Sequence, residues 1–273
     1  MSKEAFFISC FSSRMIGDDG ALWAGNVYSK DLFCEEIHFK RSWMSLTQIA
    51  KKSMLVNISD AIAMNATPKV AMIGIVIPKT FSYAQLQELA EGFELVAKEY
   101  GIEIIGGDTT AGKTLMISIS LVSTPRGKIL QRKNAKMGDL VAYTGTLGAS
   151  YKGLTRLLRG GTVSSQNKFI TPRLKAAFVM KSAKYLHAGM DISDGLSKDL
   201  SRLFGGKHQT IHSRKTLPKR VLCSGEEYEM LFSFDTRKAG TIKRLAQKTR
   251  TPVTILGRIQ RGRYTCLCKE HHF

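Results

Sequence analysis

The stretch "IEIIGGDTTAGKTLMISIS", residues 102–120, contains glycine, lysine and threonine at the spacing G-x-x-x-x-G-K-T, which is typical of a phosphate-binding loop. Such a loop works because its glycine-rich turn opens a helix, whose first N–H groups converge on phosphate oxygens. After Thr114, however, apolar and small polar residues alternate, which predicts a strand. We therefore interpret residues 106–108 (GGD) as a tight turn that holds a carboxylate for a cation, and Lys113 as a turn residue.

Helix and strand patterns alternate on both sides of this segment. The S-x-x-Q capping boxes at residues 45–48 and 82–85 predict two helices, the first running toward Ala63 and the second ending at Gly101. Residues 69–77, "KVAMIGIVI", are typical of a buried strand. The same alternation resumes in the second half of the chain. The sequence thus predicts an α/β fold, and 273 residues are enough for two modest domains.

The composition is strongly basic, with 41 Lys and Arg against 22 Asp and Glu and a net charge of +19. Residues 138–273 hold 25 of these basic and 9 of the acidic side chains. The basic residues are dispersed and lack the interleaved aromatics that stack on bases, so we expect no dedicated nucleic-acid partner. The first apolar run is too short to span a membrane and no small-residue cleavage site follows it, so we expect a cytoplasmic protein without a membrane partner.

The five cysteines are odd in number and form no C-x-x-C pair, which argues against a disulfide framework. Four soft ligands do gather near the C-terminus: Cys266, Cys268, His271 and His272. Their spacing is poor for structural zinc, which leaves a metal site as the weaker alternative to a final strand followed by a docked tail.

Several aspartates have small or apolar neighbours and stand where predicted strands end or helices begin, so we expect them to be partly buried. Buried carboxylates that gather together repel one another unless a cation pairs them, and hard oxygen ligands without matching His or Cys favour Mg²⁺. Helix caps and turns would account for about half of them taken singly. The set comprises Asp18, Asp19, Asp31, Asp60, Asp108, Asp191 and Asp194.

Eight motifs in order carry a resemblance to a known family: "IGDDGA", "SKDLFCEEIHF", "KKSMLVNISDAIAMNATP", "GGDTT", "QRKNAKMGD", "AYTGTLGAS", "MDISDGLSKDL" and "SGEEYEMLF". Together they cover nearly the whole chain and resemble thiamine-monophosphate kinase, within the superfamily of aminoimidazole ribonucleotide synthetase and selenophosphate synthetase. The resemblance implies ATP-dependent phosphorylation of thiamine monophosphate by direct in-line transfer, assisted by several Mg²⁺ ions.

The resemblance also implies an architecture and a set of site residues. An N-terminal α/β domain, residues 1–137, would bind ATP and Mg²⁺ and pair its mixed sheet across a homodimer, and a C-terminal α/β domain would span residues 138–273. The implied metal ligands are Asp19, Ser29, Asp31, Asp60, Asp108, Asp191 and Asp194. ATP would be met by Tyr100, Gly107, Asp108, Arg132 and Ser193, and thiamine monophosphate by His38 and Glu226. The residues expected to carry catalysis are Asp60, Asp108, Arg132 and Asp194.

The chain departs from the family pattern at three places. Lys30 stands where a threonine normally precedes the motif aspartate, and Glu227 replaces the aspartate of G-E-D-Y-E. Third, the chain is short between Asp199 and Gly225 and after Phe232, so that Leu267 falls near the position of the aromatic expected against the thiazole ring. Two alternatives remain at this stage: a superfamily relative that uses ATP to activate another acceptor, and a non-enzymatic basic nucleic-acid-binding protein.

Overall fold

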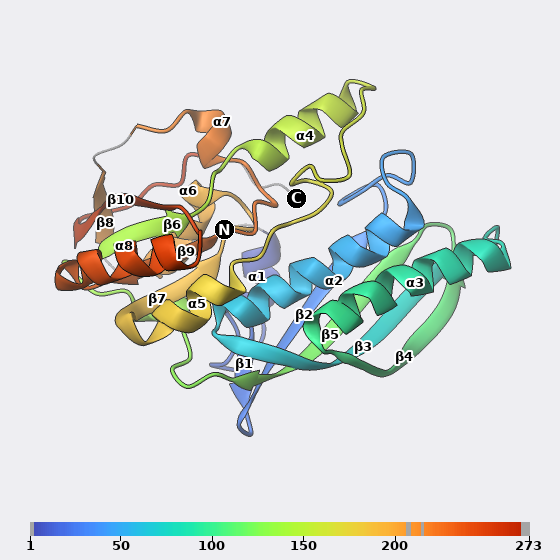
Figure 1. Cartoon of the computed structure of the whole chain (residues 1–273), viewed down its shortest axis with the longest axis horizontal. Coiled ribbons are helices and arrows are strands. Elements are labelled where there is room, and N and C mark those ends of the chain that lie inside the picture. Colours follow the sequence, from blue (N-terminus) through green and yellow to red (C-terminus); the bar gives the residue numbers. More distant parts are fainter. Residues whose placement is uncertain (1–2, 206–208, 214–215, 269–273) are drawn as a thin grey trace.

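The computed structural model describes residues 3–205, 209–213 and 216–268. Within these residues the fold is mixed α/β with two five-stranded sheets, one from each half of the chain (Figure 1). The first sheet has the order β1-β2-β5-β3-β4 and is antiparallel except between β3 and β4. Its strands are β1 (Ala21–Trp23), β2 (Asn26–Cys34), β3 (Ala66–Pro78), β4 (Glu103–Gly112) and β5 (Met116–Pro125).

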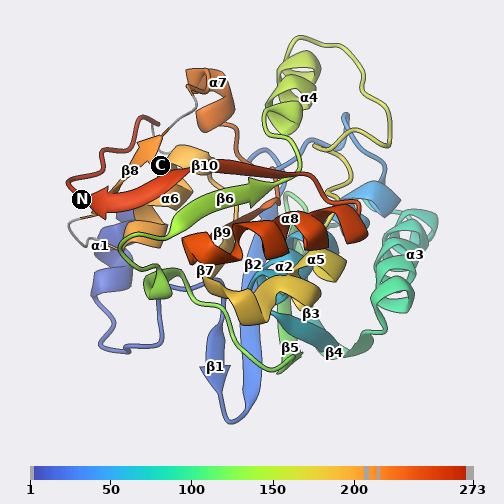
Figure 2. The ribbon, with the colours of Figure 1, turned by 60° about the vertical axis from the view of Figure 1, so that its left-hand side comes forward.

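The second sheet has the order β7-β9-β6-β10-β8 and is antiparallel throughout. Figure 2 shows helices α5 (Ala176–Ser182) and α8 (Ala239–Lys248) side by side against it. Its strands are β6 (Leu140–Thr144), β7 (Leu186–Asp191), β8 (Gln209–Ser213), β9 (Met230–Phe234) and β10 (Val253–Arg261). The remaining helices of this half are α4 (Ala149–Leu158), α6 (Leu196–Phe204) and α7 (Lys219–Leu222).

Two long helices, α2 (Leu46–Ala63) and α3 (Tyr83–Tyr100), lie across one face of the first sheet (Figure 1). Both begin at the predicted capping boxes, in which Ser45 and Ser82 accept the N–H of the residue three positions on. Gly101 ends α3 in the left-handed conformation, with φ 64°. Helix α2 is almost wholly buried because it also contacts β7 and α5, and it thereby joins the two halves.

The segment that opened the sequence analysis forms β4, a turn, and β5, with β3 between the two strands in the sheet. The predicted strand after Thr114 is confirmed, and the helix that a phosphate-binding loop requires does not follow it. The expectation of a tight turn at residues 106–108 is wrong, because these residues lie inside β4 and pair with β3. Gly107 has φ 155°, and a Cβ placed on it would lie 1.8 Å from the carbonyl oxygen of Ile73. The glycine therefore serves close strand packing.

The cysteine count and spacing argue against a disulfide framework, and the described residues contain one disulfide that this pattern did not predict, between Cys223 and Cys268, 45 residues apart in the sequence. The tail after β10 returns over α6, where the N–H of Leu267 donates to Ser197 Oγ at 3.0 Å. This tertiary contact brings Cys268 beside Cys223, and the spacing of cysteines along the chain carries no sign of it. His271 and His272 of the weaker metal hypothesis lie outside the described residues.

One short helix, α1 (Lys3–Ser9), has no buried residue and contacts α6 through ion pairs of Glu4 with Lys198 at 3.8 Å and with Arg202 at 3.9 Å. Across the part of the chain that the structure describes, no helix combines the length and apolar character needed to cross a membrane.

Candidate active site

A cavity of about 460 Å³ lies where the two halves meet. Its walls come from the loop before β1, from β2 and α2 of the first half, and from the loop after β7, helix α6 and the loop before β9 of the second half. Segments far apart in the sequence therefore meet here. We refer to it as the acidic cavity because six of the seven aspartates set apart by the sequence line it, namely Asp18, Asp19, Asp31, Asp60, Asp191 and Asp194.

Three carboxylates in this cavity are close enough to share a cation. Oxygens of Asp19, Asp60 and Asp191 all lie within 4.8 Å of one another. Ser59 Oγ donates to Asp191 Oδ2 at 2.7 Å, which fixes that side chain. The other oxygen of Asp191 and Oδ2 of Asp19 are buried and have no hydrogen-bond partner among the described residues. Buried anionic oxygens without donors are the ligands that Mg²⁺ prefers, so the donor set fits this ion.

Burial and mutual repulsion both act on these acids. Burial raises the pKa of Asp60 well above its usual value, and the charges of Asp31 and Asp191 raise it further. Burial also raises the pKa of Asp191, with a contribution from Asp19. The pKa of Asp31 is raised to about 6, chiefly by burial, although a hydrogen bond from Asp60 opposes the shift. Without a cation, the group therefore retains protons that a bound cation would replace.

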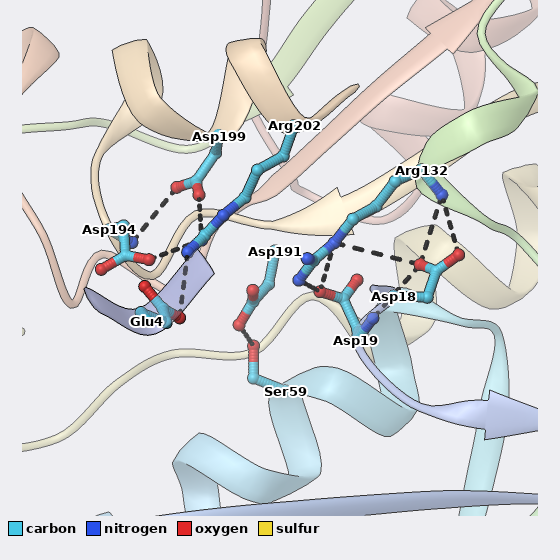
Figure 3. A network of polar contacts seen from close by, with 9 residues as sticks. All are labelled: Glu4, Asp18, Asp19, Ser59, Arg132, Asp191, Asp194, Asp199 and Arg202. Carbon is cyan, nitrogen blue, oxygen red and sulfur yellow. Dashed lines mark hydrogen bonds and ion pairs between the residues drawn. The ribbon is translucent and has the colours of Figure 1, made fainter. Parts of the chain in front are cut away.

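Two arginines, Arg132 and Arg202, pair with acids that line the acidic cavity (Figure 3). The guanidinium of Arg132 pairs with Asp19, and the backbone N–H of Arg132 lies 3.3 Å from both carboxylate oxygens of Asp18. Arg202, on α6, binds Asp194 Oδ2 at 2.5 Å and Asp199 Oδ1 at 3.0 Å. Asp194 is thus held by an arginine, outside the three-carboxylate group. Arg202 and the buried Asp199 are not among the predicted site residues, although their three-residue spacing on a helix is a recognisable ion-pair signal.

The predicted ATP and metal residues do not all meet in one chain. Ser193 lines the acidic cavity, but Tyr100 lines a separate cavity of about 330 Å³ beside α5. Gly107 and Asp108 lie on the exposed edge strand β4 and are not part of the lining of the acidic cavity. Ser29 is buried against α2, where its Oγ donates to Asn57 Oδ1 at 3.4 Å.

Both predicted substrate residues, His38 and Glu226, line the acidic cavity and also an adjoining cavity of about 440 Å³. The second cavity, which we call the aromatic cavity, includes Trp43, Tyr151 and Phe169 in its walls. Since the two predicted substrate residues belong to both cavities, they stand at the junction between an acidic and a largely apolar space.

The hydrogen bonding of His38 defines its protonation. Its Nδ1 accepts the backbone N–H of Cys34 at 3.0 Å, and its ring stacks on Phe33. A neutral imidazole that accepts through Nδ1 carries its proton on Nε2.

The departures from the family pattern have structural explanations. Glu227 Oε1 accepts the N–H groups of Gly148 and Ser150 at 2.6 and 3.2 Å, so this longer acid caps the start of α4. Lys30 Nζ donates to Ser118 and Ser120 of the neighbouring strand β5. At the end of the described chain, the side chain of Leu267 is 54% exposed.

Known proteins are similar to this chain in sequence and in fold. Residues 17–124 match the family model "AIR synthase related protein, N-terminal domain". A thiamine-monophosphate kinase of Nitrosopumilus maritimus is 30% identical over 247 residues, covering 84% of this chain and 79% of that protein. One of Pyrococcus horikoshii is 28% identical over 97% of this chain and 89% of that protein. The solved structure of AaThiL complexed with AMPPCP and TMP superposes with a TM-score of 0.83 at 26% identity, covering 96% of this chain and 90% of that one. The chain therefore belongs to the thiamine-monophosphate kinase family.

Proposed function

We propose that the protein transfers the terminal phosphoryl group of ATP to thiamine monophosphate, giving thiamine diphosphate and ADP. The observation that carries the proposal is the junction of the two cavities. Buried carboxylates suited to a cation lie on one side, and an aromatic-lined space suited to an organic ring system lies on the other. A phosphorylated substrate with a ring system needs both environments next to each other. Membership of the kinase family agrees with this arrangement.

Asp19, Asp60 and Asp191 would hold Mg²⁺, with Asp31 beside them. When bound, Mg²⁺ supplies positive charge that neutralises the phosphates and aligns the attacking and leaving oxygens. Arg132 keeps Asp19 in place through its guanidinium and adds a fixed positive charge at the wall of the same cavity.

The chain needs no strong general base for this reaction. The accepting group is a phosphate whose second pKa is about 6, so it is largely ionised at neutral pH. His38, which lines both cavities, is placed to contact the substrate rather than to act as a base.

We further propose that ATP is bound with the help of a second copy of the chain. Strand β4 is the edge of its sheet. Ile105 on this strand is 54% exposed, and Met72 on the paired strand β3 is 42% exposed. An edge with exposed apolar side chains favours pairing with another copy. In a homodimer, Gly107 and Asp108 of one copy would then complete the acidic cavity of the other.

The test is a product assay with purified protein, ATP, Mg²⁺ and either thiamine monophosphate or thiamine. We expect thiamine diphosphate and ADP from the first acceptor, little product from the second, and no product in excess chelator. Phosphorylation of thiamine with no reaction of thiamine monophosphate would overturn the proposal. Consumption of ATP without phosphorylation of thiamine monophosphate or of thiamine would point instead to another acceptor.

A further inference from the structure

Helix α2 carries a buried lysine, Lys52, that is not part of the lining of the acidic cavity. The side chain of Lys52 is completely buried, and its Nζ lies 3.1 Å from Glu226 Oε2 and 3.7 Å from the centre of the Phe169 ring. A lysine is almost never fully buried unless it is paired, because removing an ammonium group from water is costly. Burial accordingly lowers the pKa of Lys52, and the charge of Glu226 opposes this shift.

The partner of this lysine is the residue at the junction of the two cavities. Glu226 has φ 54°, a left-handed conformation that is uncommon for a residue other than glycine, and its N–H donates to the carbonyl oxygen of Ser193 at 2.7 Å. Lys52 holds one carboxylate oxygen of Glu226. The other, Oε1, is buried and has no hydrogen-bond partner among the described residues. Glu226 thus has one oxygen fixed by the protein and one left to accept a hydrogen bond from a ligand.

The same ammonium group also lies beneath the second predicted substrate residue. Lys52 Nζ is 5.5 Å from the centre of the Phe33 ring, and that ring stacks on the imidazole of His38. One buried side chain therefore supports both residues at the junction, through an ion pair on one side and an aromatic ring on the other.

We propose that Lys52 is a positioning residue for the thiamine part of the substrate: it holds Glu226 in one orientation and cancels its charge, so that Oε1 accepts a hydrogen bond from a donor on the ring system. The inference rests on the function proposed above. The pairing with Lys52 also offsets the cost of burying the Glu226 carboxylate at the junction.

An alternative role, holding the fold together, makes different predictions. Buried ion pairs contribute little net stability, and apolar side chains of similar volume often replace them without loss. Methionine is close to lysine in shape and is apolar. Replacing Lys52 alone leaves the Glu226 carboxylate unpaired and lowers the melting temperature under either role. A purely stabilising lysine would affect the KM of both substrates alike, whereas a positioning lysine would affect the KM of thiamine monophosphate alone.

The experiment compares four proteins with the wild type: Lys52→Met, Glu226→Gln, the double variant, and the control Lys51→Met on the neighbouring, partly exposed position of α2. For each, the KM of both substrates, kcat, the melting temperature and the calorimetric Kd for thiamine monophosphate are measured. We expect Lys52→Met to weaken binding and raise the KM of thiamine monophosphate by about tenfold or more, with the KM of ATP unchanged. Lys51→Met should behave as wild type.

The double variant shows whether Lys52 acts through Glu226. Once Glu226→Gln has removed the charge, adding Lys52→Met should change the KM by less than about threefold and should restore melting temperature, because it removes an unpaired buried ammonium. Equal effects of Lys52→Met in both backgrounds, or on both substrates, would overturn the proposal. If Lys52→Met alone does not fold, the comparison of the double variant with Glu226→Gln decides.

A wild type that binds thiamine monophosphate without phosphorylating it would count against the proposed function, while the calorimetric comparison would still decide the role of Lys52. A wild type that does not bind thiamine monophosphate would overturn both.

Discussion

Two sets of acidic side chains that the sequence places in one metal site have opposite environments. Asp19, Asp60 and Asp191 converge in the acidic cavity, where burial raises the pKa values of all three. Asp108 lies on an exposed edge strand, and its Oδ1 accepts the N–H of Thr109 at 2.9 Å. One chain thus contains a group of three buried carboxylates suited to binding a cation and, outside the acidic cavity, the solvent-exposed Asp108. Acids that the family resemblance assigns to one metal site therefore lie in two separate places within one copy of the chain.

The largest expected effect is on turnover. Asp60→Asn and Asp108→Asn should each reduce kcat by about 10³-fold or more, because an amide keeps the shape of the carboxylate but loses the charge that binds Mg²⁺. Thermal unfolding separates the two. Without metal, Asp60→Asn should melt higher than the wild type by a few degrees because a crowded charge is removed, whereas Asp108→Asn should melt at the wild-type temperature. Equal metal-free melting temperatures would contradict the difference in environment.

Mixing the two inactive variants tests whether the exposed acid serves another copy. If each site combines the acidic cavity of one copy with β4 of the other, a mixed dimer of Asp60→Asn and Asp108→Asn contains one intact site of two. Random exchange of subunits should then restore about one quarter of wild-type activity. A mixture that stays inactive, in protein that light scattering shows to be dimeric and exchanging, would place both acids in the site of one copy.

The pH dependence of stability should follow the buried acids. Burial raises the pKa of Asp18 and Asp31 to about 6 and that of Asp199 to about 7. Between about pH 4 and 7 the folded, metal-free protein then binds more protons than the unfolded chain, so the free energy of unfolding falls as pH rises through this window.

We therefore expect the metal-free melting temperature to fall by about 3–6 °C between pH 5.5 and 7.5, and Mg²⁺ to oppose this fall because it replaces the protons. Asp60→Asn should show a shallower dependence, and Asp108→Asn the wild-type one. A melting temperature that rises with pH over this range would contradict the raised pKa values of the buried acids.

The smallest effect is expected at Lys113, which lies in the turn between β4 and β5. Lys113→Ala should change kcat/KM by about threefold at most, since the lysine of a true phosphate-binding loop would be a main charge-stabilising donor and its loss would cost orders of magnitude. Steady-state kinetics beside Asp108→Asn provides the contrast. A folded Lys113→Ala protein as inactive as Asp108→Asn would restore the phosphate-loop hypothesis.

Local signals in the sequence were sufficient for much of the fold. The capping boxes at Ser45 and Ser82 and the glycine at position 101 place α2 and α3 because caps act within one turn of a helix. The alternation after Thr114 predicts β5 for the same reason, as a local pattern with period two.

Features that depend on close approach of distant segments were not predictable in this way. Residues 106–108 have the composition of a turn, yet they are part of β4 and pair with β3. Glycine is needed at position 107 because the backbone of Ile73 on the paired strand leaves no room for a side chain there. The bond between Cys223 and Cys268 and the burial of Lys52 against Glu226 likewise join segments separated by 45 and 174 residues. Neither has a signature in local spacing.

The contact between Gly107 and Ile73 has a consequence for how this gene can change. A selection that requires only a folded product should recover glycine alone at position 107, because any β-carbon there would meet a backbone oxygen at 1.8 Å. The same selection should accept many residues at Asp108, which is exposed. A selection for growth that depends on the enzyme should hold both positions. Sequencing a mutant library under each regime would therefore separate the residue that shapes the strand from the neighbour that we expect to act in the reaction.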